Sequence, residues 1–177
     1  MAKSILITGG ARSGKSRFAE TLALAPTGRA IYIATAEARD AEMTARIARH
    51  RARRGAAWTT RQEPIELLAA LVETDDSETQ RLVDCLTLWL SNLMLGGADW
   101  EGAARDLAAA IPEARAPVLF VTNEVGAGIV PENRLAREFR DAAGFLNQRV
   151  AAVCEEVHLV VAGCPLRIKP PAGDGSG

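Results

Sequence analysis

The sequence lacks the features that would place the chain in a membrane, in an oxidising compartment or on nucleic acid. It has only three cysteines among 177 residues, without a C-x-x-C pair, and an odd number of thiols suits a reducing compartment. No apolar run approaches the length of a membrane span. The 21 lysines and arginines nearly balance the 22 aspartates and glutamates, so no overall positive field favours nucleic acid. The first apolar run starts at Ser4, which leaves no room for a signal peptide. We expect a cytoplasmic protein with buried thiols.

Short apolar runs alternate with helix-like segments along the chain, a pattern typical of a parallel sheet covered on both faces. Strands are predicted at Ser4–Thr8, Ala30–Ala34, Trp58–Thr60, Arg81–Asp84, Val118–Thr122 and Val157–Ala162. Helices are predicted at Arg17–Leu24, Ala41–Arg54, Pro64–Glu73, Leu86–Leu95, Trp100–Ala110 and Asn133–Val153. From Pro165 onwards no element is predicted. The length fits one domain, which we place at residues 1–169, followed by a flexible tail at 170–177. The predicted fold class is a three-layer α/β domain with a mostly parallel sheet.

A complete phosphate-binding loop follows the first predicted strand. Residues 9–16 read G-G-A-R-S-G-K-S and match G-x-x-x-x-G-K-[ST] between a strand and a helix start. The glycines let successive N–H groups surround phosphate oxygens, and the helix N-terminus adds a positive field. Lys15 is expected to reach the β- and γ-phosphates, and the Ser16 hydroxyl to ligate Mg²⁺. The motif predicts a P-loop domain that binds a nucleoside triphosphate through Gly9, Gly10, Ala11, Arg12, Ser13, Gly14, Lys15 and Ser16.

Polar residues also follow three other predicted strands, at Thr35-Ala36-Glu37, Asp84 and Asn123-Glu124. In parallel sheets ligands bind beyond the carboxyl ends of the strands, so we expect these segments and the phosphate loop to converge on one cleft. Asp84 could hold Mg²⁺ or its water, or be an ordinary N-cap of the next helix. Glu124 could orient or deprotonate a substrate hydroxyl; alternatively, Asn123 and Glu124 only satisfy the backbone of their loop.

The predicted helix at 41–54 carries five arginines around one of the two histidines of the chain. Arg46, His50, Arg53 and Arg54 recur at helical spacing and share one side. Such a face suits phosphate oxygens, because guanidinium groups bind them bidentately, but it could also be an ordinary solvated face. Positive surroundings disfavour protonation of an imidazole, so His50 is a candidate nucleophile towards phosphorus; the alternative is a histidine without a catalytic role. His158, inside a strand, is predicted to be a packed core residue.

Several motifs occur together in this chain. They are G-G-A-R-S-G-K-S-R-F-A-E at 9–20, Y-I-A-T-A at 32–36, D-x-E-M-x-x-R-I-x-x-H-R at 40–51, N-E-V-G-x-G-I-V-P-E-N-R-L-A-R-x-F-R-D at 123–141, N-Q-R-V-A at 147–151 and V-V-A-G at 160–163. With them the chain closely resembles the bifunctional adenosylcobinamide kinase/adenosylcobinamide-phosphate guanylyltransferase family of cobalamin biosynthesis (the CobU/CobP family). The resemblance extends to Lys169. The block at 123–133 is far more specific than the phosphate loop, which many families share.

The resemblance implies two reactions. ATP or GTP phosphorylates adenosylcobinamide, and GTP then transfers GMP to that phosphate through a GMP–histidine intermediate, which gives adenosylcobinamide-GDP and pyrophosphate. It further implies that His50 is the nucleophile, that the fold is RecA-like and that the protein is a homotrimer. The implied nucleotide contacts are residues 9–16 and Thr35, Ala36, Glu37, Arg53, Arg54, Gly55, Gln62, Glu63 and Asp84, and the choice between Gln62 and Glu63 is open. Two rival functions are a P-loop kinase for another small alcohol and a RecA-like ATP switch that binds a partner.

Overall fold

A computed structural model describes residues 3–37, 45, 48, 55–76 and 78–170 of the chain. Within these residues a seven-stranded sheet has the order β3-β2-β4-β5-β1-β6-β7. The pairs from β3 to β6 are all parallel, and β7 alone runs antiparallel, against β6. The strands are β1 Ser4–Thr8, β2 Ala30–Ala34, β3 Trp58–Gln62, β4 Gln80–Asp84, β5 Val118–Val121, β6 Glu156–Val161 and β7 Cys164–Lys169. The predicted α/β fold with a mostly parallel sheet is confirmed.

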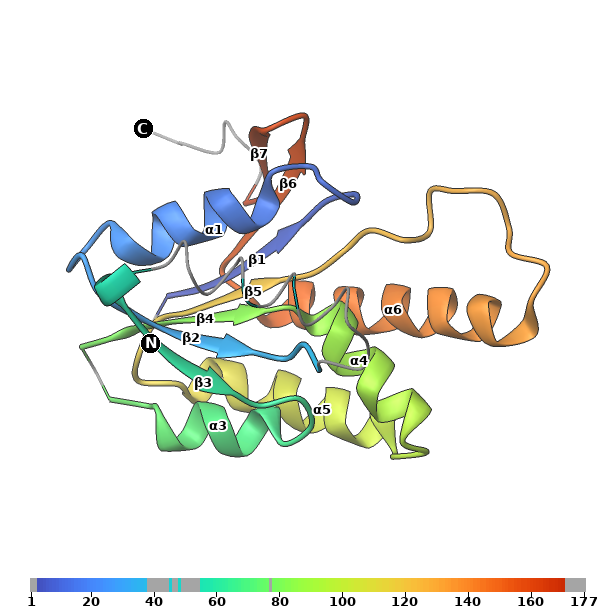
Figure 1. Cartoon of the computed structure of the whole chain (residues 1–177), viewed down its shortest axis with the longest axis horizontal. Helices are drawn as coiled ribbons and strands as arrows, with labels where there is room; N and C mark the ends of the chain where they lie inside the picture. The colour runs from blue at the N-terminus through green and yellow to red at the C-terminus, as the bar shows by residue number, and fades with distance from the viewer. Residues whose placement is uncertain (1–2, 38–44, 46–47, 49–54, 77, 171–177) are drawn as a thin grey trace.

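Helices cover both faces of this sheet (Figure 1). The helices are α1 Lys15–Leu24, α3 Leu67–Glu73, α4 Leu86–Leu95, α5 Trp100–Ala110 and α6 Arg134–Val153, with short 3-10 turns η1 Gly55–Ala57 and η2 Ile111–Glu113. Successive side chains of a strand point to opposite faces. Ile5 and Ile7 therefore join the cluster under α1, whereas Leu6 joins the larger cluster under α3 to α6. Burial on both faces explains why the strands read as unbroken apolar runs.

Hydrogen bonds outside the regular elements explain why α3 begins later than predicted. The carboxylate of Glu63 accepts from the N–H groups of Ile65 (3.4 Å) and Glu66 (3.0 Å). These bonds hold a turn ahead of the helix, which starts at Leu67. The prediction that Pro64 is the first helical residue is therefore wrong.

The segment after residue 163 also differs from the prediction. Cys164–Lys169 forms β7, an edge strand paired with β6, where no element was predicted. Its sequence contains a proline and two basic residues, so the strand is specified by its partner more than by its own pattern. Cys164 is exposed, whereas Cys85 and Cys154 are buried free thiols, so the expectation of buried thiols is wrong for Cys164. Residues 171–177, most of the predicted tail, lie outside the described residues.

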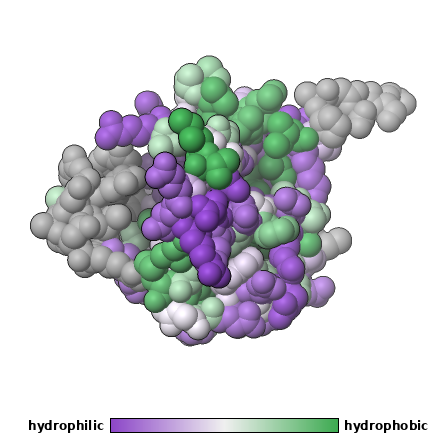
Figure 2. Space-filling view, turned by 90° about the vertical axis from the view of Figure 1, so that its right-hand side faces the viewer, coloured by the Kyte–Doolittle hydropathy of each residue, from purple (hydrophilic) through white to green (hydrophobic). Residues whose placement is uncertain are grey.

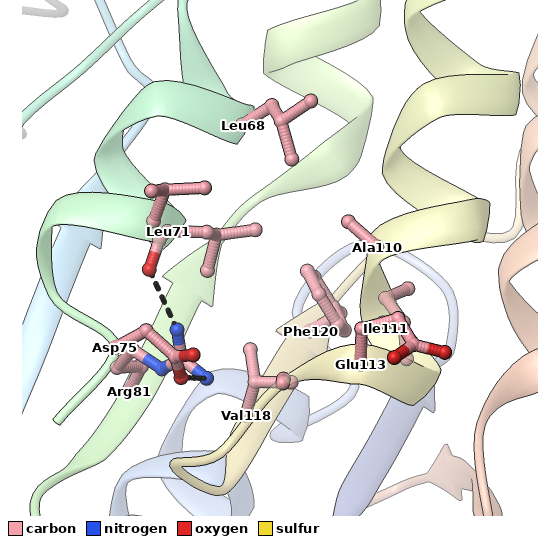
Figure 3. A pocket seen from close by; sticks show the side chains of 11 residues that line it. Leu68, Leu71, Asp75, Arg81, Ala110, Ile111, Glu113, Val118 and Phe120 are labelled. Atoms are coloured by element: carbon pink, nitrogen blue, oxygen red, sulfur yellow. Dashed lines mark hydrogen bonds and ion pairs between the residues drawn. The ribbon is translucent and has the colours of Figure 1, made fainter. Parts of the chain in front are cut away.

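An ion pair between buried Arg81 and half-buried Asp75 lies at the amino-terminal side of the sheet (Figure 3). Arg81 of β4 is 1% exposed, and its guanidinium donates to the Leu71 carbonyl (2.7 Å), donates to the Ala116 carbonyl and pairs with Asp75 (3.0 Å). These bonds connect the end of α3, the following loop and the start of β5. A cavity of about 150 Å³ between α3, β4, β5 and the end of α5 adjoins the pair.

Burial alone would raise the pKa of Asp75. The N–H groups of Ala116 and Arg115 and the charge of Arg81 outweigh burial, so the net shift is a lowered pKa. The pair is thus a stabilising element far from the strand ends that carry the predicted site.

None of the helices in the described residues is long and apolar enough to span a bilayer.

Candidate active site

Four neighbouring strands bring the predicted site segments to one edge of the sheet. In the register, Ile7 of β1 lies beside Val121 of β5, Val121 beside Asp84 of β4, and Asp84 beside Ala34 of β2. Because these strands are parallel, the segments that follow them leave the sheet side by side. Those segments are the phosphate loop, Asn123-Glu124, Asp84-Cys85 and Thr35-Ala36-Glu37.

Close packing determines where the phosphate loop needs glycine. A Cβ on Gly9 would lie 2.5 Å from the Val160 carbonyl oxygen and 2.7 Å from the Ser13 Oγ. A Cβ on Gly14 would lie 3.1 Å from the Cα of Gly163, and Gly14 also has a φ of +95°. The N–H of Gly163 donates to the Ser13 carbonyl at 2.8 Å. The turn between β6 and β7 therefore supports the loop from behind, a role that the sequence analysis did not assign.

Several polar side chains in and next to the phosphate loop are buried or half-buried. The side chain of Lys15 is buried at the start of α1, and its ammonium donates to the Gly10 carbonyl at 3.0 Å. Ser16 follows it and is half-buried. The buried hydroxyls of Thr8 and Ser13 have no hydrogen-bond partner within the described part of the chain. Such groups cost about 1–3 kcal/mol each if they stay unsatisfied, so the loop retains hydrogen-bonding capacity for a ligand.

Asp84 is held at the end of β4 by Tyr32, whose hydroxyl donates to Oδ2 of Asp84 at 2.8 Å. The N-cap of α4 is Cys85, so the alternative that Asp84 is the cap is wrong. Burial raises the pKa of the Cys85 thiol to about 12, the Asp84 carboxylate also raises it, and the Lys15 ammonium acts to lower it. Lys15 follows β1 and Asp84 ends β4, two positions away in the sheet, so both lie at the same edge.

The oxygens available here fit magnesium. Mg²⁺ prefers oxygen ligands and is usually held by one or two carboxylates together with substrate phosphates. The Ser16 hydroxyl and the Asp84 carboxylate are such oxygens, on the loop and on the strand two positions away in the sheet. Among the described residues no group of three or more His, Cys, Asp or Glu side chains could hold a metal.

Thr35 makes its hydrogen bonds within the protein. Its hydroxyl donates to the Cys85 carbonyl (2.7 Å) and accepts from the Cys85 N–H (2.8 Å). Its carbonyl accepts from the Asn92 side chain at 2.8 Å. Thr35 is fully buried, so its observed role is to fix the backbone that follows Asp84.

Gln62 and Glu63 point to different places. The Gln62 amide donates to the Ala36 carbonyl, at the edge where the predicted nucleotide contacts lie. Glu63 instead bonds the turn before α3. Glu37 is half-buried, and Gly55 is exposed at the start of η1 with a φ of +60°. Of the pair left open by the sequence, Gln62 lies against the predicted nucleotide-binding segment.

Glu124 is tied to the phosphate loop through its backbone. Its N–H donates to the Gly9 carbonyl at 3.1 Å, and its Oε1 accepts from the Gly126 N–H at 2.6 Å. The interpretation that this side chain satisfies its loop therefore holds for Oε1. Among the hydrogen bonds of the described residues, none involves Oε2 of Glu124.

A polar network that sequence reasoning missed holds the start of the same loop. Thr122 donates to the Asn147 Oδ1 of α6 (2.7 Å), and the Asn147 amide donates to the Asn123 carbonyl (3.2 Å). The Asn123 N–H donates to the hydroxyl of Thr87 on α4 (2.7 Å). The only sequence signal was the N-Q-R-V-A motif of the resemblance. Through this network α4 and α6 determine the position of Glu124.

Of the two histidines, only His158 lies within the residues that the structure describes. His50, Arg53 and Arg54, like most of the predicted helix at 41–54, lie outside the described residues, although Ala45 and Ala48 are helical. His158 lies 3.0 Å from the Glu156 carboxylate, and its ring packs against Phe18 at 5.3 Å between centroids. It is packed, as predicted, but it lies partly buried at the face under α1 and makes a polar contact there.

Comparisons with known proteins cover almost the whole chain. Residues 5–168 match the family model of cobinamide kinase/cobinamide phosphate guanyltransferase. The chain is 48% identical to the bifunctional adenosylcobalamin biosynthesis protein CobP of Pseudomonas aeruginosa, over 93% of this chain and 96% of that protein. It is 46% identical to the bifunctional adenosylcobalamin biosynthesis protein CobU of Salmonella typhimurium, over 93% of this chain and 99% of that protein.

Similarity to solved structures is weaker. The P4 protein of bacteriophage phi6 in complex with ADP has a TM-score of 0.46 at 15% identity, over 93% of this chain and 52% of that chain. The ATPase domain of a second solved protein has a TM-score of 0.47 at 11% identity, over 89% of this chain and 68% of that chain. This chain thus spans about half the length of the phi6 protein.

Proposed function

Because this chain belongs to the cobinamide kinase/cobinamide phosphate guanyltransferase family, we propose that its phosphate loop and the neighbouring strand ends form the nucleotide site of both reactions. The protein is a bifunctional cobinamide kinase and cobinamide phosphate guanylyltransferase of adenosylcobalamin biosynthesis. The resemblance found in the sequence is confirmed. Its nucleotide substrates are ATP and GTP, as the family implies. The observation that carries the proposal is the convergence of the loop with Asp84 and Glu124 at one sheet edge.

In the kinase reaction, Lys15 exchanges its bond to the Gly10 carbonyl for the β- and γ-phosphates. The buried hydroxyl of Ser13 and the loop N–H groups bind phosphate oxygens. Ser16 and Asp84 would hold Mg²⁺, which neutralises charge on the phosphates when bound. These roles follow from the position of each group, because electrostatic stabilisation by prearranged donors is the main contribution a protein makes to phosphoryl transfer.

Glu124 is placed for the acceptor hydroxyl. The hydroxyl oxygen of cobinamide attacks the γ-phosphorus, its proton passes to Oε2 of Glu124, and the nucleoside diphosphate leaves. The backbone bond between Glu124 and Gly9 fixes the spacing between base and phosphate loop. Glu124 is exposed, as a residue that receives a proton from a large incoming substrate must be.

We assign the second reaction to His50, on the family resemblance and on the arginines around it in the sequence. An imidazole nitrogen attacks the α-phosphorus of GTP and pyrophosphate leaves. A phosphate oxygen of cobinamide phosphate then attacks the same phosphorus, the N–P bond breaks and the imidazole is regenerated. Arg53 and Arg54 would stabilise the departing pyrophosphate. A direct attack by the weakly nucleophilic phosphate monoester on GTP is thereby divided into two displacements at the α-phosphorus.

Two further proposals rest on the resemblance and on chemistry. We propose a homotrimer, which equilibrium sedimentation would test. We also propose a cytoplasmic location, since three free cysteines suit a reducing compartment where nucleoside triphosphates are available.

Substitution of Glu124 separates the two activities. Glu124→Gln keeps the shape and the acceptor oxygen for the Gly126 N–H but removes the base. We expect phosphorylation of cobinamide to fall about 10²-fold or more, while transfer of GMP to supplied cobinamide phosphate falls less than about threefold. Initial rates with each acceptor, measured at saturating nucleotide, give both values. Equal losses in the two reactions would contradict the base role and assign Glu124 to the loop architecture.

A further inference from the structure

The loop between β5 and α6 presents apolar side chains to solvent. Ile129 is 97% exposed, Val130 59% and Leu135, in the first turn of α6, 51%. In Figure 1 this loop projects from the end of the molecule where the parallel strands end, and Figure 2 shows that face, with hydrophobic surface beside polar surface. Neighbouring exposed apolar residues are typical of a binding surface.

Hydrogen bonds fix this loop at both ends. At one end the Glu124 N–H bonds the Gly9 carbonyl of the phosphate loop. At the other end the Arg137 guanidinium donates to the carbonyls of Pro131 (2.9 Å) and Glu132, and the Asn133 side chain caps α6. The exposed apolar residues therefore lie on a segment with a defined shape, directly connected to the phosphate loop.

A groove of about 250 Å³ continues from the loop between α4 and α6. It is lined by Ser91, Met94, Leu95, Asn133, Leu135, Ala136 and Phe139. Leu95, at the end of α4, is 57% exposed. We call the groove together with Ile129 and Val130 the apolar rim. The apolar rim therefore includes residues of the β5–α6 loop, of α4 and of α6. Glu124 lies at the start of the same loop.

We propose that the apolar rim binds the corrin macrocycle of cobinamide, an inference that rests on the proposed function. The hydroxyl of cobinamide must reach the γ-phosphate at the phosphate loop, and the macrocycle, much larger than a nucleotide, must then lie beyond Glu124. The rim begins there. A corrin ring edged with methyl groups and amide side chains suits apolar residues interspersed with polar groups such as Ser91 and Asn133. Adenosylcobinamide carries a positive charge, and the exposed carboxylates of Glu124 and Glu132 complement it.

The test is a pair of substitutions with a matched control. Ile129→Asn and Val130→Asn replace apolar area at the rim without adding charge. Leu166→Asn on β7 is the control, because Leu166 is 58% exposed, like Val130, and lies at the sheet edge beyond β6. We expect each rim variant to raise the KM for cobinamide about tenfold. The KM for nucleotide and the labelling of the protein by α-labelled GTP should stay unchanged, since neither needs the corrinoid.

Three results separate the possibilities. An unchanged KM for cobinamide in both rim variants, or an equal rise in Leu166→Asn, would overturn the proposal. A change of oligomeric state in sedimentation, with the KM for cobinamide unaltered, would also overturn it and assign the rim to contact with a second copy of the chain. Failure of the proposed function would look different, because the unsubstituted protein would then neither phosphorylate cobinamide nor become labelled by GTP.

Discussion

At the scale of single residues, the phosphate loop could be recognised from its sequence, but the reason for each glycine could not. The motif requires Gly9 and Gly14, and the structure shows that Gly9 lies against Val160 near the end of β6 and Gly14 against Gly163 in the β6–β7 turn. Gly10 stands at a variable position of the motif, and a Cβ there would meet no heavy atom within 4 Å. Contacts between segments distant in sequence decide this difference, so local patterns alone do not predict it.

This difference gives a matched pair of alanine substitutions. Gly9→Ala should weaken nucleotide binding about tenfold or more, because relieving its close contacts costs about 1–3 kcal/mol and displaces the loop. Gly10→Ala should change nucleotide affinity less than about twofold. Titration of each variant with a fluorescent GTP analogue measures both values. Equal affinity in the two variants would show that the close contacts of Gly9 with Val160 and Ser13 do not constrain the loop.

Asp84 offers a second test at this scale. In Asp84→Asn the side-chain oxygen can still accept from the Tyr32 hydroxyl, so thermal unfolding should stay unchanged. The amide is a weaker magnesium ligand, and we expect the half-saturating Mg²⁺ concentration of the kinase reaction to rise about tenfold. Tyr32→Phe, which removes the bond and keeps the carboxylate, is the control for mere loss of the contact. A loss of stability without a change in Mg²⁺ dependence would assign Asp84 a purely structural role.

At the scale of elements, buried strands could be predicted and edges could not. β1 and β2 have the predicted bounds because both their faces are covered, which leaves an unbroken apolar run in the sequence. β7 was missed because an edge strand is specified largely by pairing with β6. The start of α3 was misplaced because the Glu63 side chain competes for N–H groups that the helix would otherwise include.

The ion pair of Arg81 and Asp75, which connects α3 to β4, should contribute strongly to stability. Asp75→Asn leaves a buried guanidinium without its counter-charge, and we expect the free energy of unfolding at pH 7 to fall by about 3 kcal/mol. Urea unfolding measures this loss. Asp141→Asn, which removes the charge from the surface ion pair with Arg140, is the control and should cost less than about 1 kcal/mol.

The same pair predicts a dependence on pH. The folded-state pKa of Asp75 is lowered, so its contribution is present above the unfolded pKa of about 3.9 and is lost as the pH falls through the folded value. The difference in unfolding free energy between the original protein and Asp75→Asn should therefore be constant from pH 7 to 5 and shrink below about pH 4. A difference that stays constant down to pH 3 would contradict the assigned role of the charge.

At the scale of the whole molecule, the proposed nucleotide site and the Arg81–Asp75 ion pair lie at opposite ends of one sheet. The carboxyl ends of β1, β5, β4 and β2 carry the phosphate loop, Glu124, Asp84 and Thr35, whereas the amino-terminal side of β4 carries the ion pair. The sequence could predict this convergence because parallel strands place their following residues at one edge. It could not predict the supporting network of Thr87 and Asn147, which depends on how α4 and α6 pack.

The most direct test of the account is covalent labelling of the protein by α-labelled GTP with Mg²⁺. We expect one labelled GMP per chain, released in acid and stable in base, as an N–P bond requires. His50→Ala should not be labelled, whereas His158→Ala, which removes one of the two partners of Glu156, should be labelled like the original protein. Label that survives acid, or that persists in His50→Ala, would contradict the account and place the nucleophile elsewhere.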